Sequence, residues 1–356
     1  MTATSTWLDY LAYDPLPVLA AADDPAVAYF ARRDLQDVAV GSVAALWDLP
    51  AVNRILRRQT PQGTWPTRNR ARTGINPDGP LLVEAYRHLR VLVDQYEMDR
   101  RHQSIACAAE YVLSHQTAEG DIRGILANQY APYYTGALLG LLAKAGYADD
   151  PRIQAGTDWL LSMRQSDGGW APGSPGMVDL KGVQTRQLWQ MVSNPSIETA
   201  RAFDWSRPFS ASATGMAIRA LTAQPRWRHS VEAVAAGRLL KSKLLCKDNW
   251  TSYQHEDHWL RFDYPYWWTN LVSALEVLAL IGFTKDDPDV ARGLRWLAEH
   301  QEEDGLWRTS YSRIHKTTGQ PPHRDHQMWV TLAICRVWRR FHDPNAPWPA
   351  PASPGR

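Results

Sequence analysis

The sequence has few cysteines and no long apolar run. Its three cysteines, Cys107, Cys246 and Cys335, are far apart and form no Cys-x-x-Cys pair, which excludes a disulfide framework and a thiolate zinc finger. No apolar run approaches the ~20 residues that a membrane helix needs. The N-terminal residues lack the basic start and apolar core of a signal peptide. We therefore expect an intracellular, cytoplasmic protein without an integral membrane segment.

Neither sign of charge is in excess. The chain of 356 residues contains 39 Lys and Arg against 37 Asp and Glu, a formal net charge of +2. Nucleic-acid-binding domains usually carry a clear basic excess, so no nucleic-acid partner is predicted. Hydrophobic residues make up 44% of the chain and charged residues 21%, a balance typical of a protein with a packed core.

Phenylalanine is scarce, whereas tryptophan is abundant, at 6 and 17 residues. Part of the tryptophan belongs to a repeat in which a Gln is followed by a Gly and then by Trp or Ile. The four copies are Gln59–Trp65, Gln116–Ile122, Gln165–Trp170 and Gln301–Trp307, and a fifth segment, Leu239–Trp250, keeps only the preceding helix pattern and the Trp. Recurrence of this kind indicates a repeat architecture.

Helical patterns lie on both sides of each turn. Before the last turn, Val290, Leu294 and Leu297 recur at helical spacing. An Asp followed by Pro, a typical helix start, occurs at Asp24, Asp150 and Asp287. The runs after the turns are apolar on more of their circumference and are predicted to be buried inner helices: 81–96, 131–145, 211–223, 266–281 and 326–341. Residues 7–49 should supply further helices that close a ring.

The Gln-x3-Gly-x-Trp turns, with the inner-helix pattern from Ser212 to Leu221, resemble the repeats of squalene–hopene cyclases and of protein prenyltransferase β subunits. The chain is also similar to bacterial prenyltransferase-like proteins built of a single barrel. The resemblance covers about residues 24–341 and implies an all-α fold, a single α/α toroid of about five to six helix pairs within residues 1–343.

Two segments depart from the repeat. The insertion at about 171–207 is predicted to be a lid over the barrel mouth, because loops of this length in compact domains are usually functional or disordered. Residues 344–356 form a Pro-rich tail.

The known acid and metal motifs of the family are incomplete. Proton-initiated cyclases of this fold use an Asp-x-Asp-Asp acid, and the nearest string here, 286–289, matches the helix-start pattern instead. Prenyltransferases bind zinc through an Asp-x-Cys pair and a later His. Asp263 and His326 are similar to the Asp and the His, but Pro265 stands in place of the Cys. The resemblance thus implies a divalent metal at Asp263 and His326, with one ligand missing.

Polar residues gather at one end of the predicted barrel. Antiparallel helix pairs place all outer-to-inner loops at one end, the near rim, and all inner-to-outer loops at the other end, the far rim. Two His-x-Asp-His stretches fall on the near rim before the last two inner helices. Imidazole and carboxylate groups bind transition metals and exchange protons near neutral pH. The candidate catalytic residues are His255, Asp257, His258, Asp263, His323, Asp325 and His326. Alternatively, these stretches are surface loops whose Asp residues cap helices.

Basic and aromatic residues of the same rim are candidate substrate ligands. Guanidinium groups bind diphosphates and carboxylates in a bidentate manner, and aromatic rings line apolar cavities and stabilise cations. The candidates are Arg68, Arg261, Tyr133, Tyr134, Tyr266, Trp267, Trp268 and Trp329. The alternatives are a solvated basic loop and ordinary core packing.

Three functions follow from these patterns. The favoured one is an enzyme with cyclase- or transferase-type chemistry that holds a hydrophobic, isoprenoid or terpenoid small molecule in the barrel. The second is a glycan-active lyase or hydrolase. The third is a non-catalytic protein that binds a hydrophobic ligand. The sequence leaves the substrate and the oligomeric state open.

Overall fold

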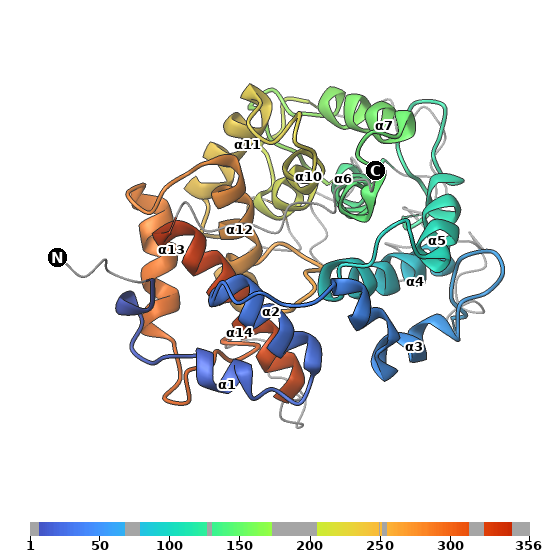
Figure 1. Ribbon diagram of the computed structural model, residues 1–356. Helices are drawn as coiled ribbons and strands as arrows, with labels where there is room; N and C mark the ends of the chain where they lie inside the picture. The colour runs from blue at the N-terminus through green and yellow to red at the C-terminus, as the bar shows by residue number, and fades with distance from the viewer. Residues whose placement is uncertain are drawn as a thin grey trace.

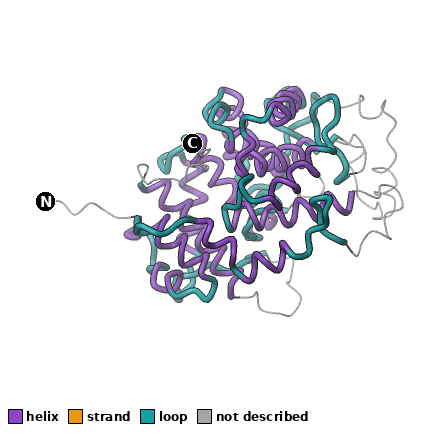
Figure 2. The backbone as a smooth tube through the Cα atoms, turned by 45° about the vertical axis from the view of Figure 1, so that its right-hand side comes forward, coloured by secondary structure: helices purple, strands orange, loops and turns teal. Residues whose placement is uncertain are grey.

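A computed structural model describes residues 7–67, 79–126, 130–172, 205–248, 250, 255–312 and 324–343. Across these ranges the regular structure consists of helices and two isolated β-bridges, and Figure 2 shows helices joined by loops. The predicted all-α fold is confirmed. No helix within these ranges is long and apolar enough to cross a membrane. Most of the predicted lid and the whole Pro-rich tail lie outside the described residues.

Six helices of the described chain form the inner wall of a barrel (Figure 1). They are α2 (Pro25–Leu35), α4 (Gly79–Arg90) with its π-helical extension η4 (Val91–Gln95), α6 (Pro132–Leu142) with η5 (Ala143–Tyr147), α10 (Ala211–Ala223), α12 (Leu271–Ile281) and α14 (Arg324–His342). Helix α10 packs against α6 and α12, and α14 packs against α12 and α2. Helices α6, α10 and α12 are buried around most of their circumference, as the apolar inner runs predicted.

An outer layer of helices surrounds this wall. It consists of α1 (Leu16–Ala20), α3 (Pro50–Leu56), α5 (Gln103–Leu113), α7 (Pro151–Ser162), α11 (Val231–Ser242) and α13 (Pro288–Glu299). Three 3-10 helices, η1 (Trp7–Tyr10), η2 (Val43–Asp48) and η8 (Glu256–Leu260), lie in the connections. Each outer helix precedes an inner one, and one hydrophobic core extends from Trp7 to Phe341. The described helices therefore make the predicted toroid of helix pairs.

The Gln and Trp residues of the repeat connect helix ends. Nε2 of Gln59 donates to the carbonyl of Gly63 in its own turn and to that of Ser104 at the start of α5, at 3.2 and 2.8 Å. Gln116 makes the corresponding pair one repeat later. The indole N–H also donates to a carbonyl of the preceding outer helix in Trp65, Trp170 and Trp307. These bonds satisfy backbone groups that a helix end leaves unpaired, so the residues of the repeat have a structural role.

The inner helix predicted at 266–281 begins five residues later, at Leu271. Asn270 and Ser273 form a capping box: Oδ1 of Asn270 accepts from the backbone N–H of Ser273, and Oγ of Ser273 accepts from that of Asn270. This reciprocal pair fixes the helix start. The preceding residues, 261–270, therefore form a non-helical segment, called here the plug segment.

Asp24 lies at the near rim, unlike the Asp-Pro starts of the outer helices at Asp150 and Asp287. It caps α2 through the backbone N–H of Ala26, as the Asp-Pro pattern indicated, but α2 belongs to the inner layer. Its Oδ2 accepts a hydrogen bond of 3.0 Å from the indole of Trp329, near the start of α14. Asp24 is thus at the near rim. The same cap starts helices of either layer, so the pattern alone does not assign the rim.

Candidate functional site

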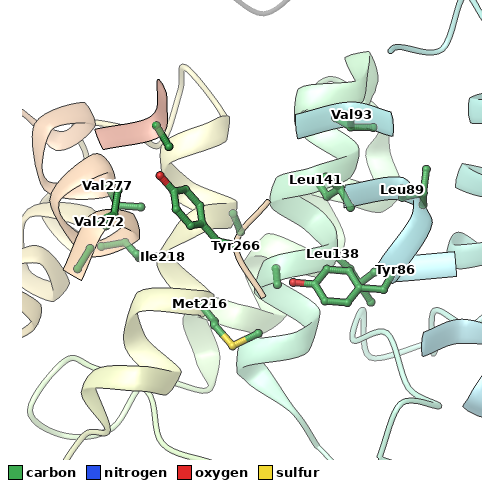
Figure 3. Packing of buried hydrophobic residues seen from close by; sticks show 14 of the residues in the cluster. Tyr86, Leu89, Val93, Leu138, Leu141, Met216, Ile218, Tyr266, Val272 and Val277 are labelled. Atoms are coloured by element: carbon green, nitrogen blue, oxygen red, sulfur yellow. The ribbon is translucent and has the colours of Figure 1, made fainter. Parts of the chain in front are cut away.

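Arginine side chains of two inner helices hold the plug segment inside the barrel. Nη1 of Arg90, on α4, donates to the carbonyl of Pro265. The guanidinium of Arg219, on α10, donates to three successive carbonyls, at 3.2, 3.3 and 3.0 Å, of Tyr266, Trp267 and Trp268. Figure 3 shows Tyr266 between Val277 of α12 on one side and Leu138 of α6 on the other. The segment therefore occupies the barrel interior rather than its surface.

The plug segment divides the interior into two halves. Tyr264 and Tyr266 line a cavity of about 380 Å³, together with residues from the later turns of the inner helices. We call this the far half, because it lies toward the far rim. Asp263, Trp267 and Trp268 have neighbours on the near-rim side, described next, and with them form the near half.

Aromatic rings gather in the near half. The ring of Trp267 lies 5.0 Å from that of Tyr86, between centroids, and the ring of Trp268 lies 5.8 Å from that of Tyr134 and 6.3 Å from that of Tyr133. Four of the predicted substrate-binding residues are thus brought together, with Tyr86 as a fifth ring that the prediction missed. Ring faces carry negative charge density, so such a wall suits an apolar or cationic group.

Asp263 is the acidic group of this half. Its Oδ2 accepts from the backbone N–H of Trp267 at 2.9 Å, and its Oδ1 accepts from Nδ2 of Asn270 at 3.1 Å. Nη1 of Arg90 lies 3.9 Å from Oδ2. Although 38% of the side chain stays accessible, the carboxyl group lies deep in the barrel. This burial raises its pKa, against the opposing effects of the Trp267 N–H and of Arg90.

His326, at the start of α14, is the titratable neighbour of Asp263. Burial lowers the pKa of its imidazole, and the nearby carboxylate of Asp263 opposes that effect. The two shifts go in opposite directions. The carboxyl group keeps its proton to a higher pH than usual, while the imidazole loses its proton at a lower pH than usual. Neighbouring groups whose environments separate their pKa values in this way are candidates for acid–base roles.

The first His-x-Asp-His stretch lies elsewhere and makes cap contacts. Nδ1 of His255 accepts from the backbone N–H of Asp257 at 3.1 Å, which starts η8. Nδ1 of His258 donates to the carbonyl of His255 at 2.6 Å. Oδ2 of Asp257 accepts from the hydroxyl of Ser312 at 3.3 Å. These contacts fit the capping alternative for this stretch.

The remaining predicted residues are dispersed. Arg261 is exposed and forms an isolated β-bridge with Ser310. Trp329 stacks on Tyr264, and Asp325 is exposed in the first turn of α14. Arg68 and His323 lie outside the described residues. Of the predicted site, the structure therefore gathers six residues in the near half: Asp263, His326, Tyr133, Tyr134, Trp267 and Trp268.

The donor set of the near half does not complete a zinc site. A structural or catalytic zinc takes three or four protein ligands. In the ranges that the structure describes, no three His, Cys, Asp or Glu side chains group as ligands. Both oxygens of Asp263 already accept hydrogen bonds, and Pro265 offers no side-chain donor at the third position. The predicted metal at Asp263 and His326 thus gains no support from the described residues.

The far half escaped the sequence analysis, which placed only helix caps at that rim. Each of the six inner helices, extensions included, contributes one charged side chain to the cavity lining: Arg33, Asp94, Lys144, Arg219, Glu276 and Arg336. The signal that would have found this ring is a single charge late in each otherwise apolar inner run.

Comparisons with known proteins give distant likenesses. No family model and no curated protein matches the chain. A variant of the type II terpene cyclase MstE from Scytonema, solved with geranylgeranyl dihydroxybenzoate, is 14% identical over 82% of this chain and 95% of its own, with a TM-score of 0.38. A polysaccharide lyase is 12% identical over 76% of this chain and 75% of its own, with a TM-score of 0.42. A protein from Actinoplanes is 16% identical over 81% and 96%, with a TM-score of 0.29. Likenesses at these scores carry no functional argument.

Proposed function

We propose that the near half is the active site of an enzyme that acts on an apolar, isoprenoid-type small molecule by acid catalysis, a cyclase- or isomerase-type reaction. The observation that carries the proposal is the carboxyl group of Asp263, which has a raised pKa and lies beside the aromatic rings of Trp267 and Tyr86. A carboxyl group with a raised pKa keeps its proton to a higher pH than usual and can donate it to a substrate beside it.

In the proposed reaction, Asp263 transfers its proton to one carbon of a carbon–carbon double bond. The positive charge then lies on carbon, where ring faces stabilise it. The ring of Trp267 already faces a cation, since the guanidinium carbon of Arg90 lies 4.6 Å from its centroid. Loss of a proton from a neighbouring carbon ends the reaction as a new double bond. The neutral imidazole of His326 would accept this proton from carbon and pass it to Asp263, which restores the acid.

Arg90 is a candidate ligand for a polar head group of the substrate. Its side chain is nearly buried, and its Nε has no hydrogen-bond partner among the described residues. A guanidinium N–H in such a place is costly to leave unpaired. A diphosphate, carboxylate or hydroxyl oxygen could accept from it while the apolar chain lies along the aromatic rings. Arg90 would thus take the role that the sequence analysis gave to Arg68.

The experiment is incubation with geranylgeraniol and geranylgeranyl diphosphate in deuterium oxide, with products identified by mass spectrometry. Protonation of a double bond by Asp263 should place one deuterium on carbon in the product. Asp263→Asn should reduce product formation by about 10²–10⁴-fold, the usual worth of a general acid, with the thermal midpoint nearly unchanged.

The matched control is Asp286→Asn, because Asp286 is an exposed carboxylate of the nearest acidic string. This variant should keep full activity. Equal activity of the two variants would contradict the role of Asp263. Products without deuterium on carbon would contradict the proton-initiated step.

A further inference from the structure

The charges around the far-half cavity do not cancel. Four of its six inner-helix charges have ion-pair partners: Arg33 with Glu97 at 2.6 Å, Arg336 with Asp34 at 2.5 Å, and Asp94 and Lys144 with each other at 2.9 Å. Arg219 is bound instead by neutral carbonyls of the plug segment. These carbonyls stabilise the positive charge of Arg219 through hydrogen bonds, but they do not neutralise it.

Arg228 adds a second uncompensated cation to the cavity lining. It lies in the loop after α10, and its Nε donates to the carbonyl of Thr222 at 2.8 Å. Among the described residues, no carboxylate contributes to the pKa of its guanidinium. Burial lowers its pKa, and it contributes in turn to a lowered pKa of Arg340. Two guanidinium groups that disfavour each other's charge would both be stabilised by an anion between or beside them.

Glu276 is an acidic residue that reduces the positive charge of the cavity, because it lines the same space. Its carboxylate acts on Lys144 and on Arg340, which offsets its charge from two sides. The other carboxylates of the lining, Asp94, Glu97 and Asp99, are paired with Lys144, Arg33 and Arg101. Against the remaining carboxylate, Glu276, stand Arg219 and Arg228, so the cavity keeps an excess of positive charge.

A buried donor also faces the cavity. Tyr266 is 7% exposed, and its hydroxyl lies beside the carboxylate of Glu276, which adds to the effect of burial in raising the pKa of the phenol. In Figure 3 the hydroxyl end of the Tyr266 side chain points toward Val277, and its backbone end lies toward Met216. Val277 lines the cavity. Buried hydroxyl groups are nearly always hydrogen-bonded, and here the acceptor is the carboxylate of Glu276, so Tyr266 occupies one side of the acidic group in the cavity wall. Apolar walls from Val93, Leu280 and Val337 complete the lining.

We propose that the far-half cavity is a binding site for a small organic anion with an apolar body, a carboxylate or a phosphate monoester. Arg228 pairs with the anionic group, and the valine and leucine side chains cover the apolar part of the ligand. The volume of about 380 Å³ lies within the range of pockets for small molecules. This site lies on the opposite side of the plug segment from Asp263 and stands independently of the proposed reaction.

The test uses octanoate as the probe, titrated calorimetrically into the full chain at low ionic strength. We expect saturable binding of octanoate and weak or no binding of octylammonium, which has the same apolar body and the opposite charge. Arg228→Gln should weaken octanoate binding by about tenfold or more, the usual effect of losing a charged hydrogen bond.

The matched control is Arg226→Gln. Arg226 lies two residues before Arg228 and its side chain is exposed, so this variant removes the same charge outside the cavity. It should bind octanoate as the wild type does. Arg228→Lys keeps the positive charge, so it should bind octanoate more tightly than Arg228→Gln does. The comparison requires that Arg228→Gln is folded, with the thermal midpoint of the wild type. His326→Ala, in the near half, should leave octanoate binding unchanged.

Three outcomes would overturn the proposal. The first is octylammonium binding as tight as that of octanoate. The second is an equal affinity of Arg228→Gln and Arg226→Gln for octanoate. The third is that the wild type shows no saturable binding of octanoate and none of inorganic phosphate, titrated in the same way as a second anionic probe.

Discussion

Asp263 connects the position of the plug segment with the proposed chemistry. Its two oxygens accept hydrogen bonds from Trp267 and Asn270, which are the residues that place the aromatic run and start α12. The same burial that makes these bonds structural also disfavours the charged carboxylate. A single side chain is therefore both a positioning group and the candidate acid, and its substitution has to be read with stability and activity measured together.

The pH dependence of stability should reveal the buried carboxyl group. Its pKa is raised in the folded state above the value of about 3.9 in an unfolded chain. The unfolded state therefore loses this proton first, and the contribution of Asp263 to stability is lost as pH rises through the folded pKa. We expect the free energy of unfolding of the wild type, minus that of Asp263→Asn, to fall as pH rises from about 4. A difference that rises with pH, measured by urea unfolding, would contradict this.

Among the helices, α6 and α10 make the closest approach. A Cβ built on Gly136 of α6 would lie 2.5 Å from Cα and 2.7 Å from the carbonyl oxygen of Ala217 on α10. These are backbone atoms, which cannot yield as a side chain does. The glycine thus sets the spacing of two helices that position Tyr134 and Arg219 on either side of the plug segment.

Gly136→Ala should therefore destabilise the protein, by about 1–3 kcal/mol as overpacked sites do, despite the better helix propensity of Ala. Gly293→Ala is the matched control on α13. Its new Cβ would meet only side-chain atoms of Leu271 and Leu275, at 3.1 and 3.3 Å, so its stability should stay within about 1 kcal/mol of the wild type. Chemical denaturation measures both. Equal stability of the two variants would contradict the close-approach argument.

For the whole molecule, the repeat predicted the barrel but not its interior. Helix caps and Gln turns depend on local sequence, so their roles at Asp150 and Gln59 could be predicted. The ring closes through Gln301, which exchanges hydrogen bonds with the backbone of Tyr13, again from a recurring Gln. Repetition therefore fixes the layers and the closure.

The contents of the barrel depend on contacts between distant residues. The plug segment enters because Arg90 and Arg219 bind its carbonyls, and no local pattern marks those arginines as its ligands. The two His-x-Asp-His stretches also match the same pattern, so the sequence does not distinguish them. Only the fold separates His326, which faces Asp263, from His255, which caps η8. The candidate site was predicted in part for this reason.

The most direct test of the account is the titration of the Asp263 carboxyl group itself. Carbon-13 NMR of the protein labelled at aspartate Cγ, compared with Asp263→Asn to assign the signal, measures its midpoint. The account predicts a midpoint above the usual value of about 3.9, as burial in the near half requires. A midpoint at or below that value would show that the carboxylate is ionised and well solvated, and would remove Asp263 as the acid.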